Sequence, residues 1–398
     1  MQKKDILELT RRFKKNECTF TKLCGCYVNA NKEIVTRISE TFLNIQDEEF
    51  YKYLEIAKKT LSGTIGNNIL SLDIPEKEEE KGGKQHFLMA LKESKLKNSD
   101  LLERFYEQVI ENYEYVGNYL ILVYHDAYDI ITKTSDNSKI DESEEVYEYL
   151  LCSICPVTLS KPGLGYKDNE NRIGARERDW VVGVPDIGFL FPTFSDRSSD
   201  IHSITYYIKD AKNSHAEFIE GLLGCNPKYT ATEKKIILKN IVKKAVGCES
   251  EDAEEVMTTI QKTLNEKYDV AENQNDIPVT KAVIKEVLTE SGMEDTIVKT
   301  IEKDYEESFA EDIPEITALV DTKVLKKAEE VAEKKELKKQ VKELQEELGS
   351  VKTYDVVLRV KEEKEKEIKT QIIDGTKYIM IPMEENENVN INGSKKNI

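Results

Sequence analysis

Two pairs of closely spaced cysteines are the residues in this sequence whose spacing most directly suggests chemistry. Cys24 and Cys26 flank a glycine, and Cys152 and Cys155 are separated by two residues. Four thiolates would satisfy a structural zinc ion. The first pair, however, has C-x-C spacing, and both pairs lie in strand-like segments instead of turns. Because free cysteine is among the most buried residue types, we interpret all four as core residues and expect no bound zinc and no cofactor.

A group of histidines and aspartates near the ends of predicted strands is the second candidate. His125 and Asp126 follow an apolar run, and Asp196, Asp200 and His202 lie in a short polar segment. Imidazole and carboxylate groups at such places can act as general acids and bases or hold a metal. Asp and Ser also dominate turns for local reasons, and no catalytic triad is evident. A metal-assisted or acid–base enzyme is therefore the alternative interpretation, and the sequence leaves open whether any reaction is catalysed.

Glycine and arginine residues between 163 and 197 form a weak phosphate-binding pattern. Glycine exposes backbone N–H groups, and arginine can bind phosphate through two hydrogen bonds. The segment contains neither G-x-x-x-x-G-K-[ST] nor a complete G-x-G-x-x-G, so no motif supports nucleotide binding. The residues concerned are Gly163, Gly165, Arg172, Arg176, Arg178 and Arg197.

Segment 228–244 combines a strong positive charge with a helical pattern. It carries six lysines and one acid, Glu233, in a chain whose formal net charge is −18. Lys235, Lys239 and Lys243 recur every four residues and should share one face of a helix. A solvated face is the commoner explanation, and a contact with nucleic acid or an acidic protein is the alternative. The six lysines are Lys228, Lys234, Lys235, Lys239, Lys243 and Lys244.

The elements that must position these residues mix helix and strand patterns as far as Gly247, which predicts an α+β domain over residues 1–247. Thr230 and Glu233 fit a capping box, so a helix should begin there and end at Gly247. The stretch 156–178 is rich in proline, glycine and asparagine and is expected to be a long ordered loop. The other predicted helices are 3–16, 47–62, 85–96 and 99–112, and the predicted strands are 18–28, 34–42, 119–124, 147–154, 180–184, 188–191 and 202–208.

Beyond Gly247 the composition predicts four further parts. Helices at 251–267, 280–291 and 295–309 form a helical region over residues 248–314. Residues 315–350 form a charged, coiled-coil-like helix. Residues 351–383 form a small β-unit, with strands at 355–360, 368–373 and 377–382 and a hairpin turn at Asp374-Gly375. The end of the chain, 384–398, is expected to be disordered.

The apolar stripe of the charged helix is the expected site of protein contact. It consists of Leu337, Val341, Leu344 and Leu348, which are spaced four, three and four residues apart. Such spacing is typical of a coiled-coil seam, although about three heptads are too few to distinguish a dimer from a single solvated helix. We expect self-association or binding of a protein partner through this stripe.

Bulk composition limits the classes of function. The chain has 398 residues, of which 39% are hydrophobic and 34% charged. Its acidity argues against a purely electrostatic DNA or membrane binder, because such proteins usually carry a basic surface. The apolar runs are far shorter than the roughly 20 residues of a membrane span. An odd number of cysteines, seven, and the lack of a secretory-type N-terminal pattern favour a cytoplasmic location.

Several segments together resemble a bacterial family built on a full-length domain of unknown function. They are Lys3-Lys-Asp-Ile, Arg11-Arg-Phe-Lys, Cys24-Gly-Cys26, Tyr115-Val-Gly-Asn-Tyr, His125-Asp-Ala-Tyr-Asp129, Cys155-Pro-Val-Thr-Leu-Ser-Lys-Pro-Gly-Leu-Gly-Tyr166, Phe189-Leu-Phe-Pro192 and Ile373-Asp-Gly375. That resemblance implies no particular activity.

A more distant similarity is to the bacterial nucleoid-associated protein family. It rests on a strand at 204–208, a helix ending at Leu223-Gly224 and a helix at 230–246, with Arg172-Ile-Gly-Ala-Arg176 upstream. This similarity implies a DNA-linked role. The leading interpretation is a non-catalytic binding or assembly protein, nucleoid-associated if this similarity holds, with a weak nucleic-acid contact and no membrane contact.

Overall fold

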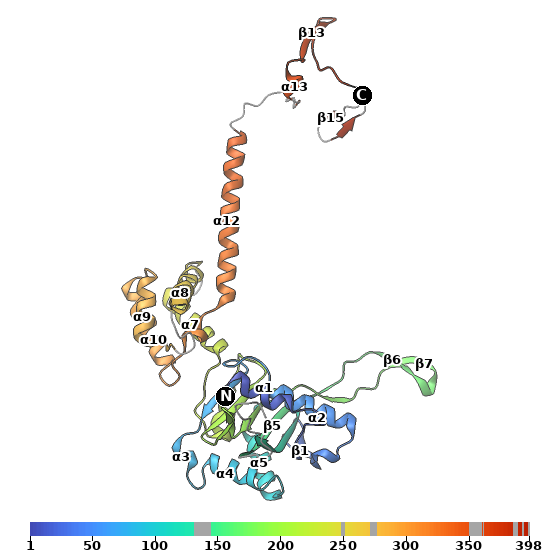
Figure 1. Cartoon of the computed structure of the whole chain (residues 1–398), viewed down its shortest axis with the longest axis vertical. Helices are drawn as coiled ribbons and strands as arrows, with labels where there is room; N and C mark the ends of the chain where they lie inside the picture. Colours follow the sequence, from blue (N-terminus) through green and yellow to red (C-terminus); the bar gives the residue numbers. More distant parts are fainter. Residues whose placement is uncertain are drawn as a thin grey trace, which may run out of the picture. The chain divides into compact units, whose positions relative to one another are not determined.

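The computed structural model describes residues 1–130, 145–247, 251–270, 277–349, 360, 362–384, 389–391 and 394–396. Its contacts divide the chain into two compact units, Met1–Ala328 and Glu329–Ile398. Figure 1 shows the chain coloured along its sequence, with many of its helices and strands labelled. The mixture of helices with an antiparallel sheet confirms the predicted α+β class.

An eight-stranded antiparallel sheet is the centre of the first unit. Its order is β2 (Ile34–Thr41), β1 (Phe20–Val28), β4 (Asn118–Ile130), β5 (Glu145–Leu159), β9 (Ile187–Phe191), β12 (Ser203–Ile208) and β3 (Ile69–Asp73), and β8 (Trp180–Val182) pairs with the far end of β5. Strands β4, β9 and β12 are almost entirely buried. Both faces of the sheet are covered, and this explains why the sequences of these strands are almost continuously apolar.

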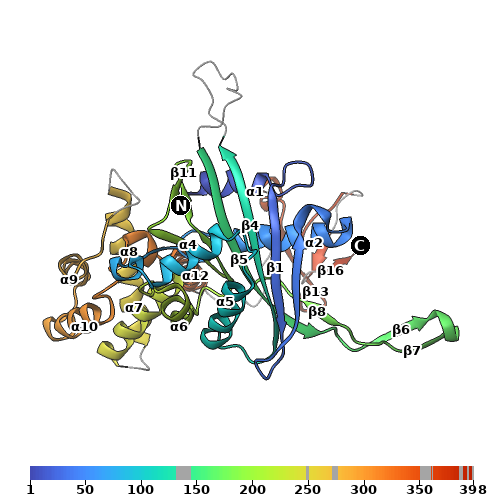
Figure 2. The ribbon, with the colours of Figure 1, turned by 90° about the horizontal axis from the view of Figure 1, so that it is seen from below.

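Helices cover the two faces of the sheet (Figure 2). One core joins the sheet to α4 (Lys84–Glu93), α5 (Ser99–Asn112) and the segment formed by α6 (Ala216–Phe218) and η3 (Ile219–Leu223). The other core joins it to α1 (Lys3–Arg11), η1 (Phe42–Asn44) and α2 (Asp47–Thr60). A short helix, α3 (Glu76–Glu79), lies in the stretch 76–84 before α4.

The predicted loop at 156–178 is instead mainly strand. Strand β5 continues through Pro156 to Leu159, paired with β4 on one side and β8 on the other. A two-stranded ribbon follows, made of β6 (Leu164–Lys167) and β7 (Arg172–Ala175) around the turn η2 (Asp168–Glu170). Proline and glycine usually weaken a strand assignment, which explains why the sequence pattern concealed both features. We call residues 160–179 the β-arm.

A helical bundle follows the sheet within the first unit. It contains α7 (Ala231–Val246), α8 (Glu251–Val270), α9 (Lys281–Glu290), α10 (Asp295–Ser308) and α11 (Ile316–Leu319) around a separate apolar core. The predicted capping box is confirmed, because the Thr230 hydroxyl accepts the Glu233 N–H at 3.0 Å and the Glu233 carboxylate accepts the Thr230 N–H at 2.8 Å. The helix ends at Gly247, as predicted.

Helix α12 (Thr322–Gly349) begins in the first unit and continues into the second. The second unit also contains α13 (Glu362–Glu365) and a hairpin of β13 (Lys369–Ile373) and β14 (Thr376–Met380), whose predicted turn at Asp374 and Gly375 is confirmed. Within the tail expected to be disordered, β15 (Val389–Ile391) pairs with β16 (Ser394–Lys396). The strand predicted at 355–360 lies outside the described residues, except for Val360.

Candidate functional site

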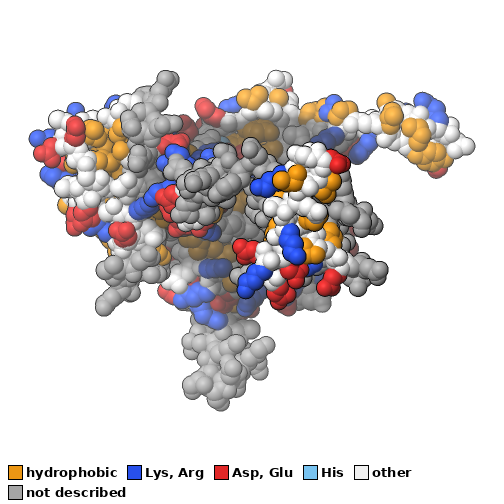
Figure 3. All heavy atoms as spheres, turned by 90° about the horizontal axis from the view of Figure 1, so that it is seen from above, with side chains coloured by type: hydrophobic (Ala, Val, Ile, Leu, Met, Phe, Trp, Pro, Cys, Tyr) orange, Lys and Arg blue, Asp and Glu red, His pale blue; other side chains and the backbone are white. Residues whose placement is uncertain are grey.

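The β-arm presents two chemically different faces. Tyr166 and Ile173 are cross-strand partners, as are Leu164 and Ala175, and alternation along the strands places all four on one face. Their side chains are uncovered: Leu164 is 78% exposed, Ile173 63% and Tyr166 59%. In the space-filling view, apolar and cationic side chains lie together along the arm at the upper right (Figure 3). One face of the arm is therefore an apolar surface in contact with solvent.

The opposite face of the arm carries cationic side chains beside a pair of glycines. Gly165 and Gly174 are cross-strand partners there and contribute no side chain, while Lys167 and Arg172 form the next pair. Both cations form ion pairs with Glu170 of the turn. Arg176 follows on the same face by alternation, and within the described residues no acidic partner is found for it. Apart from Arg197, the residues of the Gly–Arg pattern predicted from the sequence thus lie on the β-arm.

The root of the arm carries the only tryptophan of the chain. Trp180 begins β8 and is 55% exposed, and it pairs with Leu159 of β5. Val157, two residues before Leu159, belongs to the core beneath α2. Because cross-strand partners share a face, Trp180 and Val182 lie on the α2 side of the sheet. Within the described residues β8 pairs with β5 alone, so its outer edge is open.

Beside this root, α2 and the sheet form an apolar groove of about 600 Å³, which we call the α2–β8 groove. The sheet contributes Leu120 of β4 and Val182 of β8. Helix α2 contributes Glu48, Glu49, Tyr51, Lys52, Tyr53 and Ile56. The groove therefore has an apolar floor and two acidic side chains at one end of the helix, and it is large enough to hold several apolar side chains.

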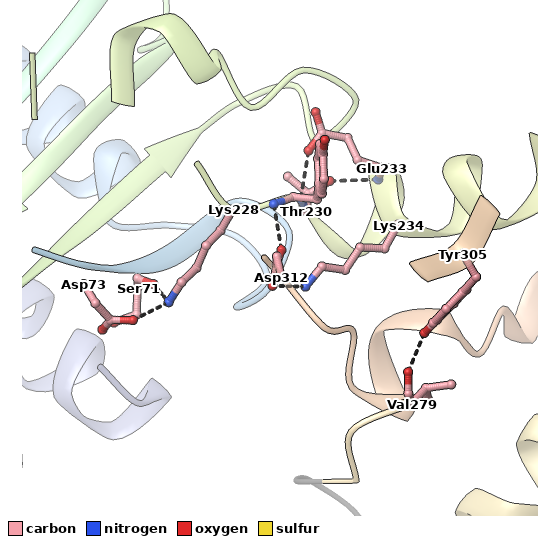
Figure 4. Close-up of polar contacts among 10 residues, drawn as sticks. Ser71, Asp73, Lys228, Thr230, Glu233, Lys234, Val279, Tyr305 and Asp312 are labelled. Carbon is pink, nitrogen blue, oxygen red and sulfur yellow. Dashed lines mark hydrogen bonds and ion pairs between the residues drawn. The ribbon is translucent and has the colours of Figure 1, made fainter. Parts of the chain in front are cut away.

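Two of the six lysines in segment 228–244, Lys228 and Lys234, form ion pairs that join parts of the protein (Figure 4). The Lys228 ammonium lies 2.7 Å from Asp73 of β3 and donates to the Ser71 carbonyl. Lys234 is almost buried and pairs with Asp312 at 2.8 Å. These contacts attach the start of α7 to the sheet and to the segment after α10, so much of the local charge has a structural explanation.

The other lysines of this segment differ in their surroundings. Lys244 pairs with Asp304 at 2.7 Å but is itself largely exposed. Lys235 is half-buried and interacts with a neighbour. Lys239 is exposed and Lys243 half-exposed, and neither forms an ion pair within the described part of the chain. Lys239 and Lys243, which lie one turn apart on α7, are therefore available to contact a partner.

The histidines and aspartates singled out in the sequence have separate partners. Asp196 and Arg197 form the turn of the hairpin between β10 (Thr193–Ser195) and β11 (Ser198–Asp200), where Asp196 pairs with Lys4 at 2.5 Å. Asp200 accepts the Ser203 hydroxyl at 2.6 Å, and His202 contacts Glu79 at 2.7 Å. These three residues hold local turns and a surface ion pair.

His125 and Asp126 are buried in β4, on opposite faces of the sheet. The His125 ring contacts the Thr21 hydroxyl at 2.6 Å and Glu148 at 3.0 Å, and burial lowers the pKa of its imidazole, an effect that Glu148 opposes. Asp126 accepts hydrogen bonds from Thr19 and Tyr149, both at 2.6 Å. Each polar group is satisfied inside the protein, as buried polar groups usually are.

The four candidate zinc ligands are divided between the two cores. Cys24, Cys26 and Cys152 belong to the core beneath α4 and α5, whereas Cys155 belongs to the core beneath α2. Burial raises the pKa of the Cys26 and Cys155 thiols to about 12. Within the described residues, no group of three or more His, Cys, Asp or Glu side chains is arranged to hold a metal ion.

Apolar side chains are also uncovered in the second unit. Leu337 and Val341 of α12 are exposed, while the side chains of Leu344 and Leu348 lie outside the described part. Every residue of the β13–β14 hairpin is exposed. Its apolar members are Ile372, Ile373, Tyr378, Ile379 and Met380. A second groove of about 630 Å³ lies beside Met380.

Neither the β-arm nor the α2–β8 groove is predicted by the sequence patterns described above. The alternation Leu-Gly-Tyr at 164–166 and Ile-Gly-Ala at 173–175 is a strand signal that could have revealed the arm. The groove has no such signal, because it joins α2 to a strand about 130 residues later in the chain. Within the described residues, no helix combines the length and hydropathy that membrane crossing requires.

Comparison with known proteins gives one result for the chain as a whole. No curated protein matches it. The model of a family described as a domain of unknown function, DUF4317, matches residues 1–394 and so covers nearly the entire chain. The resemblance to a full-length family of unknown function is thereby confirmed, and the chain belongs to the DUF4317 family.

Proposed function

We propose that this protein is a non-catalytic binding or assembly protein that acts in the cytoplasm and contacts other macromolecules through its C-terminal unit. The observation that carries the proposal is the β13–β14 hairpin, all of whose residues are exposed. An isolated two-stranded hairpin is at best marginally stable in water, and contiguous exposed apolar side chains usually mark an interaction site. A hairpin of this composition is best explained as one half of an interface.

The exposed stripe of α12 supports the same proposal. Leu337 and Val341 lie one turn apart on a highly charged helix. Apolar residues at this spacing are the knobs of helix–helix packing. The free, buried cysteines fit a reducing compartment and support the cytoplasmic assignment.

The hairpin provides its own test. Ile372 and Ile379 lie diagonally opposite on one face, with Thr370 and Lys377. Replacing both isoleucines by lysine (Ile372→Lys with Ile379→Lys) should lower the mass of the complex isolated under native conditions, measured by light scattering. Thr370→Lys places one charge on the same face without removing an apolar group and is the matched control. An unchanged complex with the double variant would refute a role for the hairpin.

An enzyme that uses His125, Asp126, Asp196, Asp200 and His202 receives less support. His125 and Asp126 are buried and bonded within the sheet, and the other three residues serve turns and surface pairs. A general base must come within hydrogen-bond reach of its substrate. The two buried residues offer no such access.

A nucleic-acid contact through α7 is a second candidate, favoured by the two lysines of this helix that have no ion pair within the described residues. Lys239 and Lys243 lie one turn apart, and a few phosphate contacts of this kind give weak, sequence-independent and salt-sensitive binding. Lys239→Glu with Lys243→Glu should abolish retardation of duplex DNA at low salt. Lys244→Glu is the control, because Lys244 already pairs with Asp304 in the wild-type protein. Wild-type protein that does not retard DNA at micromolar concentration would exclude the nucleoid-associated role.

A further inference from the structure

We propose that the open edge of β8 binds an extended segment of a partner protein as an additional strand of the sheet, with apolar and basic side chains of that segment on the α2 side. The inference goes beyond the proposed function, because it concerns an edge of the sheet in the first unit and not the C-terminal hairpin. Either surface could fail its test while the other passes.

The sheet lacks a strand beside β8. Strand β12 pairs with β9 as far as Ile208. The Lys209 N–H still donates to the Asp186 carbonyl at 2.7 Å, but the chain then turns, and the Asn213 N–H donates to the Asp210 carbonyl at 3.1 Å. Strands β8 and β9 both pair with β5 on the side away from β4. The position beside β8 that a longer β12 would occupy is therefore not filled within the described residues.

The backbone of β8 offers hydrogen-bonding groups at this edge. The Gly183 N–H donates to the Pro156 carbonyl of β5 at 2.8 Å. Because the backbone groups of successive strand residues point alternately to the two sides of the strand, those of Trp180 and Val182 point away from β5. In the described part of the chain, their N–H and C=O groups have no hydrogen-bond partner. Such an edge is a template for another strand.

The side chains beside this edge are apolar. Trp180 is 55% exposed and Val182 41%, and both lie on the α2 side of the sheet. Val182 also lines the α2–β8 groove. In an added strand every second side chain would lie on this side of the sheet, next to Trp180 and Val182 and at the border of the groove. The surface is thus suited to a segment with apolar side chains at alternate positions.

The charge at the groove favours a basic segment. Glu48 and Glu49 line the groove, are exposed and form no ion pair within the described residues. Lys52, which also lines the groove, pairs with Glu55 at 2.9 Å. Lysine or arginine beside the apolar residues, on the same side of the added strand, would meet the two carboxylates. Because opposite charges at the rim of an apolar contact select the partner, the segment that fits here carries both apolar and basic residues on its α2 side.

A synthetic peptide tests the edge directly. The probe has nine residues, with lysine, leucine, leucine and lysine at its four even positions and threonine at the others, so one side of the extended peptide carries two leucines flanked by two lysines. Its order is the same from both ends, so either direction of the added strand is allowed. Fluorescence anisotropy of the labelled peptide with the full-length protein gives the dissociation constant.

A matched peptide with glutamate in place of lysine should bind at least tenfold more weakly. Equal affinity for the two peptides, or binding of neither at millimolar concentration, would overturn the proposal.

The variant Val182→Pro tests the backbone contact. The Val182 N–H faces the open edge, so proline removes no hydrogen bond to β5, and edge strands tolerate proline at such positions. Binding of the lysine peptide should weaken at least tenfold, because proline removes an edge donor. Val182→Thr keeps both the N–H and the branched shape and is the matched control, which should bind nearly as well as the wild type. Undiminished binding by Val182→Pro would overturn the proposal.

Charge reversal separates a true contact from a loss of folding. Glu48→Lys with Glu49→Lys should reverse the preference, so that the glutamate peptide binds more tightly than the lysine peptide, which a misfolded variant cannot do. An unchanged preference would overturn the proposal. So would a wild-type protein that binds neither peptide but forms a dimer that Val182→Pro dissociates, because a second copy of the chain would then occupy the edge.

Discussion

At the scale of single residues, several buried polar groups of this protein are paired with partners distant in sequence. Asp312 shows the principle, since it accepts the Lys234 ammonium at 2.8 Å and the Tyr229 N–H at 3.0 Å. The two side chains of the ion pair are only 11% and 15% exposed. Removing a partner from such a group leaves donors without an acceptor, and this is more costly than losing a surface ion pair.

Asp312→Ala should therefore lower the free energy of unfolding by about 1–3 kcal/mol. Urea denaturation of the first unit would measure the loss. Lys244→Ala is the matched control, because Lys244 is largely exposed, and we expect no measurable change. Equal stabilities for wild type and Asp312→Ala would show that the pair does not hold α7 in place.

His125 links stability to pH. Burial lowers the pKa of its imidazole in the folded protein below the usual 6.5, while Glu148 and Asp126 oppose the effect and Lys95 adds to it. As pH falls through about 6.5, the unfolded chain therefore binds a proton at this residue that the folded chain does not, and stability decreases. His125→Gln should show a shallower loss of melting temperature between pH 7.5 and pH 5.5.

The pKa of His202 is shifted in the opposite direction from that of His125, and the same melting experiment tests it. Its hydrogen bond to Glu79 raises the pKa of this exposed imidazole, so protonation favours the folded state. His202→Gln should steepen the loss of melting temperature on acidification, because the variant lacks this stabilisation at low pH. A His125→Gln variant as sensitive to acid as the wild type would contradict the buried, neutral state of His125.

At the scale of elements, variants of helix α12 can show whether this helix packs against a partner or is only a solvated spacer. Leu337→Asn with Val341→Asn should weaken association at least tenfold, because burying one leucine contributes about 1.5–3 kcal/mol. Glu336→Asn with Gln340→Asn carries a similar helix-propensity cost off the stripe and is the control. Sedimentation velocity over a concentration series would report both variants, and identical behaviour would leave α12 as a spacer.

How far the sequence predicts each element depends on whether its signal is local. The capping box at Thr230 and the turn at Asp374-Gly375 are local and were predicted correctly. Strand β5 runs through Pro156, and the β-arm is rich in glycine, so local rules weakened both assignments. Two lysines that looked free are paired with Asp73 and Asp312, 155 and 78 residues away, which no local pattern reveals.

At the scale of the whole molecule, some of the uncovered apolar surface lies on parts that a closed domain does not need. The sheet and the helical bundle each enclose their own cores. The β-arm, α12 and the β13–β14 hairpin instead expose apolar side chains. With an excess of acidic residues that keeps such surfaces soluble, this distribution is typical of a protein that functions in an assembly.

The most direct measurement of this claim is the molar mass of the full-length chain in its native complex. The native complex is isolated from its source cells by mild lysis. Light scattering coupled to size-exclusion chromatography then gives its mass without any assumption about the partner. We predict a mass above that of one chain, held at concentrations near those in the cell. A mass equal to a single chain at every concentration, with no co-eluting macromolecule, would contradict the account.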